Sequence, residues 1–215
     1  WAEALAKDGN HVVYSDVSRE MVHGVRKRTK GRIEKYRVLE ASQWPRRMNE
    51  YDWSISFEPI PLRYTGLPLA LLRSLLNRKG AKVIYSAYFK EEAYAAVSIV
   101  KRIAKLYGAS YDVKSAKVKE RGGRIWREIE IITLETNEEA RKKAWIDVQV
   151  LKAVRSKRKE RGERKLTFEE LLQSERIKRL GISEEELVES LNRLEALISS
   201  SKLEKHFLAE VKSEK

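Results

Sequence analysis

Hydrophobic and polar positions alternate along this chain in a way that predicts strands and helices in turn. The first apolar run, "HVVYSD", is typical of a strand, and "VSREMVHGVRKRT" has the spacing of an amphipathic helix. We expect this helix to begin at Ser18 as N-cap and to turn Met21, Val22 and Val25 inward. The same alternation predicts strands at residues 36–41, 51–61 and 81–89, and helices at residues 65–77 and 90–107.

Two more strands, "YDVKSAKVKE" and "RIWREIEIITLE", are joined by "RGGR". Gly122 and Gly123 can supply the positive φ angles that a tight hairpin turn requires. Strands and helices therefore alternate up to about residue 107, and a hairpin follows. This order predicts an α/β fold: a doubly wound, mostly parallel sheet with a C-terminal antiparallel hairpin.

Residues 138–215 are predicted to form a small helical domain, which places a domain boundary after residue 137. Its first helix, residues 138–162, is basic and turns Trp145, Val148, Leu151 and Val154 inward. A short helix, a turn, a helix and a small β wing are then expected at residues 166–173, 174–183, 183–198 and 197–211. This order resembles a winged helix-turn-helix domain.

Other three-helix modules have similar leucine spacing, so a protein-docking or dimerisation role stays open for this domain. The second long helix, at the recognition-helix position, carries four glutamates near its start. Arg193 is its only basic residue, which argues against simple DNA reading by this helix.

Positive charge is concentrated in two regions of the sequence. The formal net charge is +13, and residues 19–47 and 141–165 each hold many more Lys and Arg than acids. A single basic run is often only a solvated helix face, but two patches favour a nucleic-acid partner. The candidate contacts are Arg26, Lys27, Arg28, Arg155, Lys157, Arg158, Lys159, Arg176, Lys178 and Arg179.

Cysteine is absent, which excludes disulfides, thiolate metal sites and cysteine nucleophiles. The three histidines have no ligand spacing, so no metal site is expected. No apolar run is long enough to span a bilayer and the first residues do not form a signal peptide, so no membrane association and a cytoplasmic location are expected. The high content of charged residues favours a thermophilic source.

The order of elements over residues 1–136 resembles the class I S-adenosylmethionine-dependent methyltransferase fold. In that family, the acid that closes the second strand accepts hydrogen bonds from the ribose hydroxyls of the cofactor. Asp16, followed by Val17, stands at the matching place. Independently, a carboxylate at the carboxyl end of a parallel strand lies where doubly wound sheets bind ligands. The alternative is that Asp16 only caps the helix that begins near Ser18.

Two further segments match the family in part. The family often has an acid after the next strand that meets the adenine amino group, and "VLEASQWP" offers Ala41 and Ser42 there. Amino-group methyltransferases carry Asn, Asp or Ser followed by two prolines and an aromatic, and this chain has "FEPIPL". The resemblance therefore implies that Glu58, Pro59 and Pro61 hold an amine acceptor. Alternatively, the prolines only stop a strand.

The family's first strand and glycine-rich loop would precede Trp1. That strand normally lies in the middle of the sheet. Without it, the strand that ends at Asp16 would face the "FEPIP" strand across a row of unpaired backbone groups. We therefore expect the chain to be part of a longer protein.

The sequence as a whole predicts an S-adenosylmethionine-dependent methyltransferase that acts on nucleic acid, with an exocyclic amine favoured. Cytosine C5 methylation in its usual form is excluded because it needs a cysteine. The first alternative is a non-catalytic nucleic-acid-binding or regulatory protein with a degenerate methyltransferase fold. The second is a methyltransferase for a small molecule or a protein. A homodimer is compatible with all three.

Overall fold

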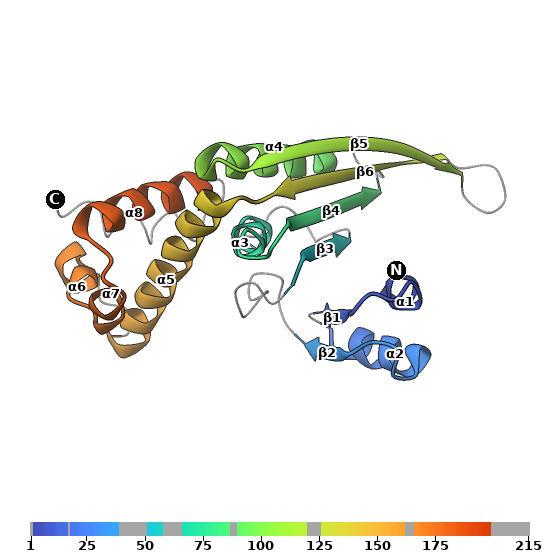
Figure 1. Cartoon of the computed structure of the whole chain (residues 1–215), viewed down its shortest axis with the longest axis horizontal. Helices are drawn as coiled ribbons and strands as arrows, with labels where there is room; N and C mark the ends of the chain where they lie inside the picture. Colours follow the sequence, from blue (N-terminus) through green and yellow to red (C-terminus); the bar gives the residue numbers. More distant parts are fainter. Residues whose placement is uncertain are drawn as a thin grey trace.

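The computed structural model has a mixed α/β fold, which confirms the class predicted from the sequence (Figure 1). Among the described residues there are two sheets, and the larger one is flanked by helices and leads into four C-terminal helices. The structure describes residues 2–16, 18–38, 51–57, 66–86, 90–119, 126–161 and 166–198.

The N-terminal part is a small βαβ unit preceded by a short helix, α1 (Ala2–Lys7). Strands β1 (Val13–Asp16) and β2 (Lys35–Val38) pair in parallel, and α2 (Arg19–Thr29) connects them. Ser18 is the N-cap of α2, as predicted, and its hydroxyl accepts a hydrogen bond from the backbone N–H of Met21 at 3.1 Å. This unit sets the position of Asp16 at the carboxyl end of β1.

One prediction about α2 is wrong. Val22 is buried and Val25 is half-buried, but the side chain of Met21 is 52% exposed. Val22, Val25 and Thr29 lie on the face of α2 that packs against the two strands. Met21 is about 100° from Val22 around the helix axis and therefore falls at the margin of that face.

The second sheet has four strands in the order β3–β4–β6–β5. Its strands are β3 (Trp53–Phe57), β4 (Gly80–Ser86), β5 (Ser110–Lys119) and β6 (Trp126–Glu135). β3 and β4 are parallel, whereas β5 and β6 form the predicted antiparallel hairpin, paired from Ser110↔Glu135 to Lys119↔Trp126. Helices α3 (Gly66–Ser74) and α4 (Lys90–Tyr107) flank this sheet.

The described strands thus form two sheets, and β1 and β3 are not paired with each other. β1 pairs with β2 on one side, and β3 pairs with β4 on one side. The sequence predicts that these two strands do not pair when the strand that the methyltransferase resemblance puts between them is absent.

The C-terminal helices are α5 (Glu138–Arg161), α6 (Phe168–Leu172), α7 (Glu175–Leu180) and α8 (Glu184–Ile198). The turn predicted at residues 174–183 is wrong, because the segment contains the helix α7. The Ser174 hydroxyl accepts from the N–H of Ile177, Gly181 ends the helix with a φ of 64°, and Ile177 is buried. The predicted β wing falls mostly outside the described residues.

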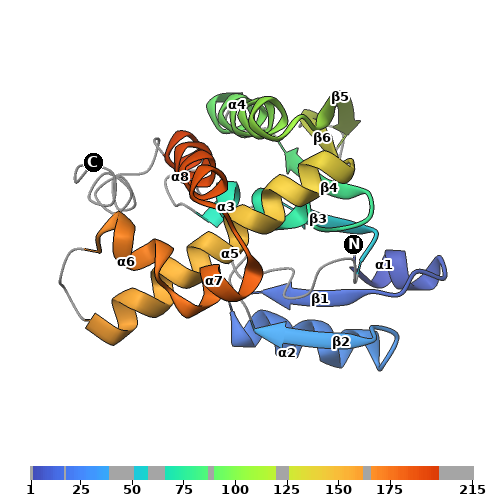
Figure 2. The same ribbon diagram turned by 60° about the vertical axis from the view of Figure 1, so that its left-hand side comes forward.

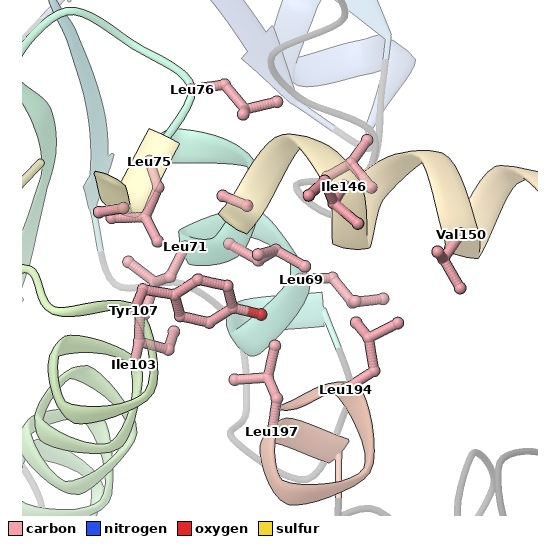
Figure 3. Close-up of a cluster of buried hydrophobic side chains, with 14 of the residues drawn as sticks. Leu69, Leu71, Leu75, Leu76, Ile103, Tyr107, Ile146, Val150, Leu194 and Leu197 are labelled. Carbon is pink, nitrogen blue, oxygen red and sulfur yellow. The ribbon is translucent and has the colours of Figure 1, made fainter. Parts of the chain in front are cut away.

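A single cluster of buried apolar side chains joins the sheet to the C-terminal helices (Figure 3). Leu71 of α3, Ile103 of α4, Ile146 of α5 and Leu194 of α8 all belong to it. The domain boundary after residue 137 stays a prediction, and the parts on its two sides share one core. None of the helices within the described ranges combines the length and the apolar composition that crossing a bilayer requires.

Candidate functional site

Asp16 closes β1 and holds the turn into α2. Its Oδ1 accepts a hydrogen bond from the backbone N–H of Ser18 at 2.8 Å, and its Oδ2 accepts one from the Tyr14 hydroxyl at 3.1 Å. The N-cap of α2 is Ser18, so Asp16 is not itself the cap. A carboxylate has about four acceptor positions, so these two bonds leave capacity for donors from a ligand. The side chain is half-buried and therefore reachable.

Tyr14 is a residue of this site that the sequence analysis missed. Burial raises the pKa of Tyr14, the negative charge of Asp16 and the hydrogen bond to it add to the rise, and Arg28 opposes it. The phenol therefore stays protonated at neutral pH. Its hydroxyl donates to the Asp16 carboxylate and so orients it. The signal was available, because residues two apart on a strand point to the same side.

The other predicted cofactor and acceptor residues lie outside the described residues. β1 ends directly before Val17, and β3 ends at Phe57, directly before Glu58. Since β3 and β4 are parallel, their carboxyl ends lie at the same edge of the sheet. The remaining residues of this group are Ala41, Ser42, Pro59 and Pro61.

The described residues of the first predicted basic patch lie on α2, β2 and the segment between them. Arg26, Lys27 and Arg28 are exposed in the second half of α2. The Arg26 guanidinium lies 6.0 Å from the centre of the Tyr36 ring, and the Tyr36 hydroxyl is hydrogen-bonded to Thr29. A shallow, open depression runs over this region, lined by Arg26, Glu34, Lys35, Tyr36 and Arg37.

The second predicted basic patch, residues 141–165, lies largely on α5, and α5 packs against α7, which carries the other predicted contacts. Arg176 of α7 donates from Nη1 to Oε1 of Gln149 on α5 at 3.1 Å, while Lys157 is paired with Glu160 at 3.1 Å. The structure therefore places the predicted contacts of α7 on a helix that packs against α5. The exposed members are Arg155, Arg158, Lys159, Lys178 and Arg179.

Arg193, the one basic residue of α8, is used inside the protein. Its guanidinium donates from Nη2 to Oδ1 of Asp147 at 2.7 Å and from Nε to Oδ2 at 3.1 Å. The Asp147 side chain is fully buried and that of Arg193 is 12% exposed. α8 therefore has no cation available to read DNA in the way a recognition helix would.

Among the described residues, no group of three or more His, Cys, Asp or Glu side chains could hold a metal ion. Comparison with known proteins finds no matching family model, no matching curated protein and no matching solved structure. The interpretation of the site therefore rests on the residues and on their geometry.

Proposed function

We propose that this protein is an S-adenosylmethionine-dependent methyltransferase that acts on an exocyclic amine of a nucleic acid. The observation that carries the proposal is the Asp16 carboxylate, which stands at the carboxyl end of a parallel strand with acceptor capacity to spare. Ligands of doubly wound sheets bind at that edge. A ribose presents two neighbouring hydroxyl donors, which suit a half-buried carboxylate.

The arrangement of the strands supports the fold part of the proposal. Among the described strands, β1 and β3 each have a partner on one side only, and both belong to parallel pairs. The resemblance to the methyltransferase fold puts a further parallel strand between these two. A doubly wound sheet would then run from β2 to the β5–β6 hairpin.

The predicted chemistry divides between three groups of residues. Asp16, beside Val17, would accept the ribose hydroxyls, and Ala41 and Ser42 would contact the adenine. When bound, the cofactor supplies a methyl group activated by its sulfonium. Glu58 and the carbonyls near Pro59 and Pro61 would accept hydrogen bonds from the substrate amine. Since proline has no N–H, the backbone at those positions can act only as an acceptor.

The nucleic-acid part of the proposal rests on the two basic surfaces, one on α2 and β2 and the other on α5 and α7. Clustered cations bind polyphosphate chains by releasing counterions. The proposal includes a cytoplasmic location. It also includes a winged-helix role for the C-terminal helices. Because Arg193 is paired with Asp147, we assign the contact to α5 and α7 rather than to α8.

Calorimetric titration of the full-length protein with S-adenosylmethionine tests the proposal. We expect saturable binding by the parent protein and a loss of about tenfold or more in affinity for Asp16→Ala, because hydrogen bonds to a charged acceptor contribute about 1.5–3 kcal/mol each. Asp112→Ala, at an exposed aspartate on β5, is the matched control and should bind like the parent.

Asp16→Asn guards against a simple loss of folding, because the amide oxygen still accepts the Ser18 N–H. Its melting temperature should be close to that of the parent, whereas its affinity for the cofactor should still be lower. A parent protein that binds nucleic acid but no cofactor would overturn the enzyme proposal and leave the non-catalytic alternative. Equal affinity of the parent and both Asp16 variants would remove Asp16 from the site.

A further inference from the structure

Cationic side chains from three helices converge beside the second basic patch. Arg73 lies in the last turn of α3, Lys152 and Arg155 lie one turn apart on α5, and Arg176 lies on α7. α5 packs against both α3 and α7, so residues distant in the sequence meet along it (Figure 2). Arg73, Lys152 and Arg176 are half-buried, and Arg155 is exposed.

Burial lowers the pKa of Lys152, and the positive charges of Arg73 and Arg176 lower it further. Burial also lowers the pKa of Arg73, and the charge of Arg155 adds to that effect. Each of the two groups is thus close enough to other cations to be repelled by them. A half-buried lysine beside other cations, such as Lys152, holds unfavourable energy that a bound anion can relieve.

A hydrogen bond fixes part of this cluster. Gln149 is 8% exposed and accepts from Arg176 Nη1 at 3.1 Å, which ties α7 to α5. Gln149, Lys152 and Arg155 follow one another at intervals of three residues along α5, so they lie on neighbouring positions of one helix face. The guanidinium of Arg176 is therefore held on the side of α5 that carries Lys152.

We infer that Arg73, Lys152, Arg155 and Arg176 form a phosphate-binding site that holds the backbone of a nucleic-acid strand at the junction of α3, α5 and α7. The inference rests on the proposed function in that it names where the proposed substrate docks. It adds Arg73 and Lys152, which lie outside the contacts predicted from the sequence. Arginine suits this task because its planar fork can donate two hydrogen bonds to one phosphate.

The salt dependence of nucleic-acid binding tests the site. Binding of a labelled single-stranded RNA and a labelled duplex DNA is measured from 50 to 400 mM salt for the parent, Lys152→Gln and Arg176→Gln. Each variant should lose one phosphate contact, which reduces the slope of log affinity against log salt by about 0.7–0.9. At about 0.1 M salt this corresponds to a loss of about five- to eightfold in affinity. Lys105→Gln, an exposed lysine on α4, is the matched control.

Thermal melting of the nucleic-acid-free proteins separates a binding role from a structural one. Because Lys152 is repelled by its neighbours, Lys152→Gln should melt at the same temperature as the parent or above it. Pyrophosphate, used as a probe, should raise the melting temperature of the parent more than that of Lys152→Gln.

If Lys152→Gln and Arg176→Gln bind nucleic acid with the same affinity and slope as Lys105→Gln, the site is overturned. The same holds if the parent binds pyrophosphate at this cluster but binds neither RNA nor DNA. Salt-independent binding by the parent would contradict the nucleic-acid part of the proposed function itself. The cofactor titration is carried out without nucleic acid, so failure of the methyltransferase proposal is seen separately.

Discussion

Replacement of Arg193 by methionine should be strongly destabilising, because it removes the partner of a buried carboxylate. Arg193 donates two hydrogen bonds to Asp147, and Tyr107 donates a third at 2.6 Å. The Asp147 side chain is 0% exposed, so it has no access to water. Arg193→Met would remove two of these three hydrogen bonds and leave a buried carboxylate that keeps the bond from the Tyr107 hydroxyl.

The expected loss follows from the cost of a buried charge whose partner is removed, about 3–5 kcal/mol. Because the Tyr107 bond remains, we expect a value near the lower end, about 3 kcal/mol. That is a large part of the total stability of about 5–15 kcal/mol that is usual for a folded domain. Equilibrium urea unfolding of the parent and the variant at pH 7 measures the difference directly.

The loss should shrink as the pH falls. Burial raises the pKa of Asp147 in spite of the opposing effects of Arg193 and Tyr107, and removal of Arg193 raises this pKa further. A carboxyl whose pKa is higher in the folded protein than in the unfolded chain destabilises the fold where it is ionised. Stability is regained as the pH falls through the folded-state pKa. The gap between parent and Arg193→Met should therefore be smaller at pH 5 than at pH 7.

Two variants make the test of this network sharp. Asp147→Asn combined with Arg193→Met removes the buried charge and keeps an oxygen that can accept from Tyr107, so the double variant should be more stable at pH 7 than Arg193→Met alone. Arg179→Met, at an exposed position of α7, should change stability by less than about 0.5 kcal/mol. A cost for Arg193→Met that is no larger than for Arg179→Met, or that does not change with pH, would refute the reasoning.

Two further changes test local features of the fold. Gly80 has a φ of 124°, and a Cβ there would lie 2.1 Å from the Leu134 carbonyl oxygen, so Gly80→Ala should lower the free energy of unfolding in urea by about 2–5 kcal/mol. Gly108, with a φ of 71°, has open space around a Cβ, so Gly108→Ala should lower it clearly less. Equal losses would contradict the steric argument. Thr167 and Glu170 form a capping box at the start of α6, so Thr167→Ala should lower the free energy of unfolding by about 1 kcal/mol, whereas Thr167→Ser should keep most of that stability. A Thr167→Ser variant as unstable as Thr167→Ala would argue against the cap.

Features that depend on short stretches of sequence were predicted well. Helix α2 begins at Ser18 as expected, and the β5–β6 hairpin pairs as its alternating pattern indicates. Of the four inward residues predicted for α5, Val148 and Val154 are buried, and Trp145 and Leu151 are half-buried. In each case the pattern of apolar residues and caps within a few turns decides the outcome.

Features that depend on packing between distant segments were missed. The apolar content of "SERIKRLGIS" is low, and α7 forms because Ile177 and Ile182 fit into a core made by other helices. The pairing of Arg193 with Asp147 joins positions 46 residues apart, which no local pattern records. The convergence of Arg73 with Lys152 has the same character, since it requires α3 to lie against α5.

The buried network around Asp147 and the cations around Lys152 share helix α5, and the first helps to position the second. Asp147, with Tyr107 of α4 and Arg193 of α8, fixes one side of α5 against the core. Lys152 stands about 140° further around the same helix, on the side that meets Arg73 and Arg176. The buried network therefore holds α5 so that its cations stay close to those of α3 and α7 in spite of their repulsion. A phosphate that binds there would meet Arg176 already held by its hydrogen bond to Gln149, so the ordering of that side chain would subtract little from the affinity.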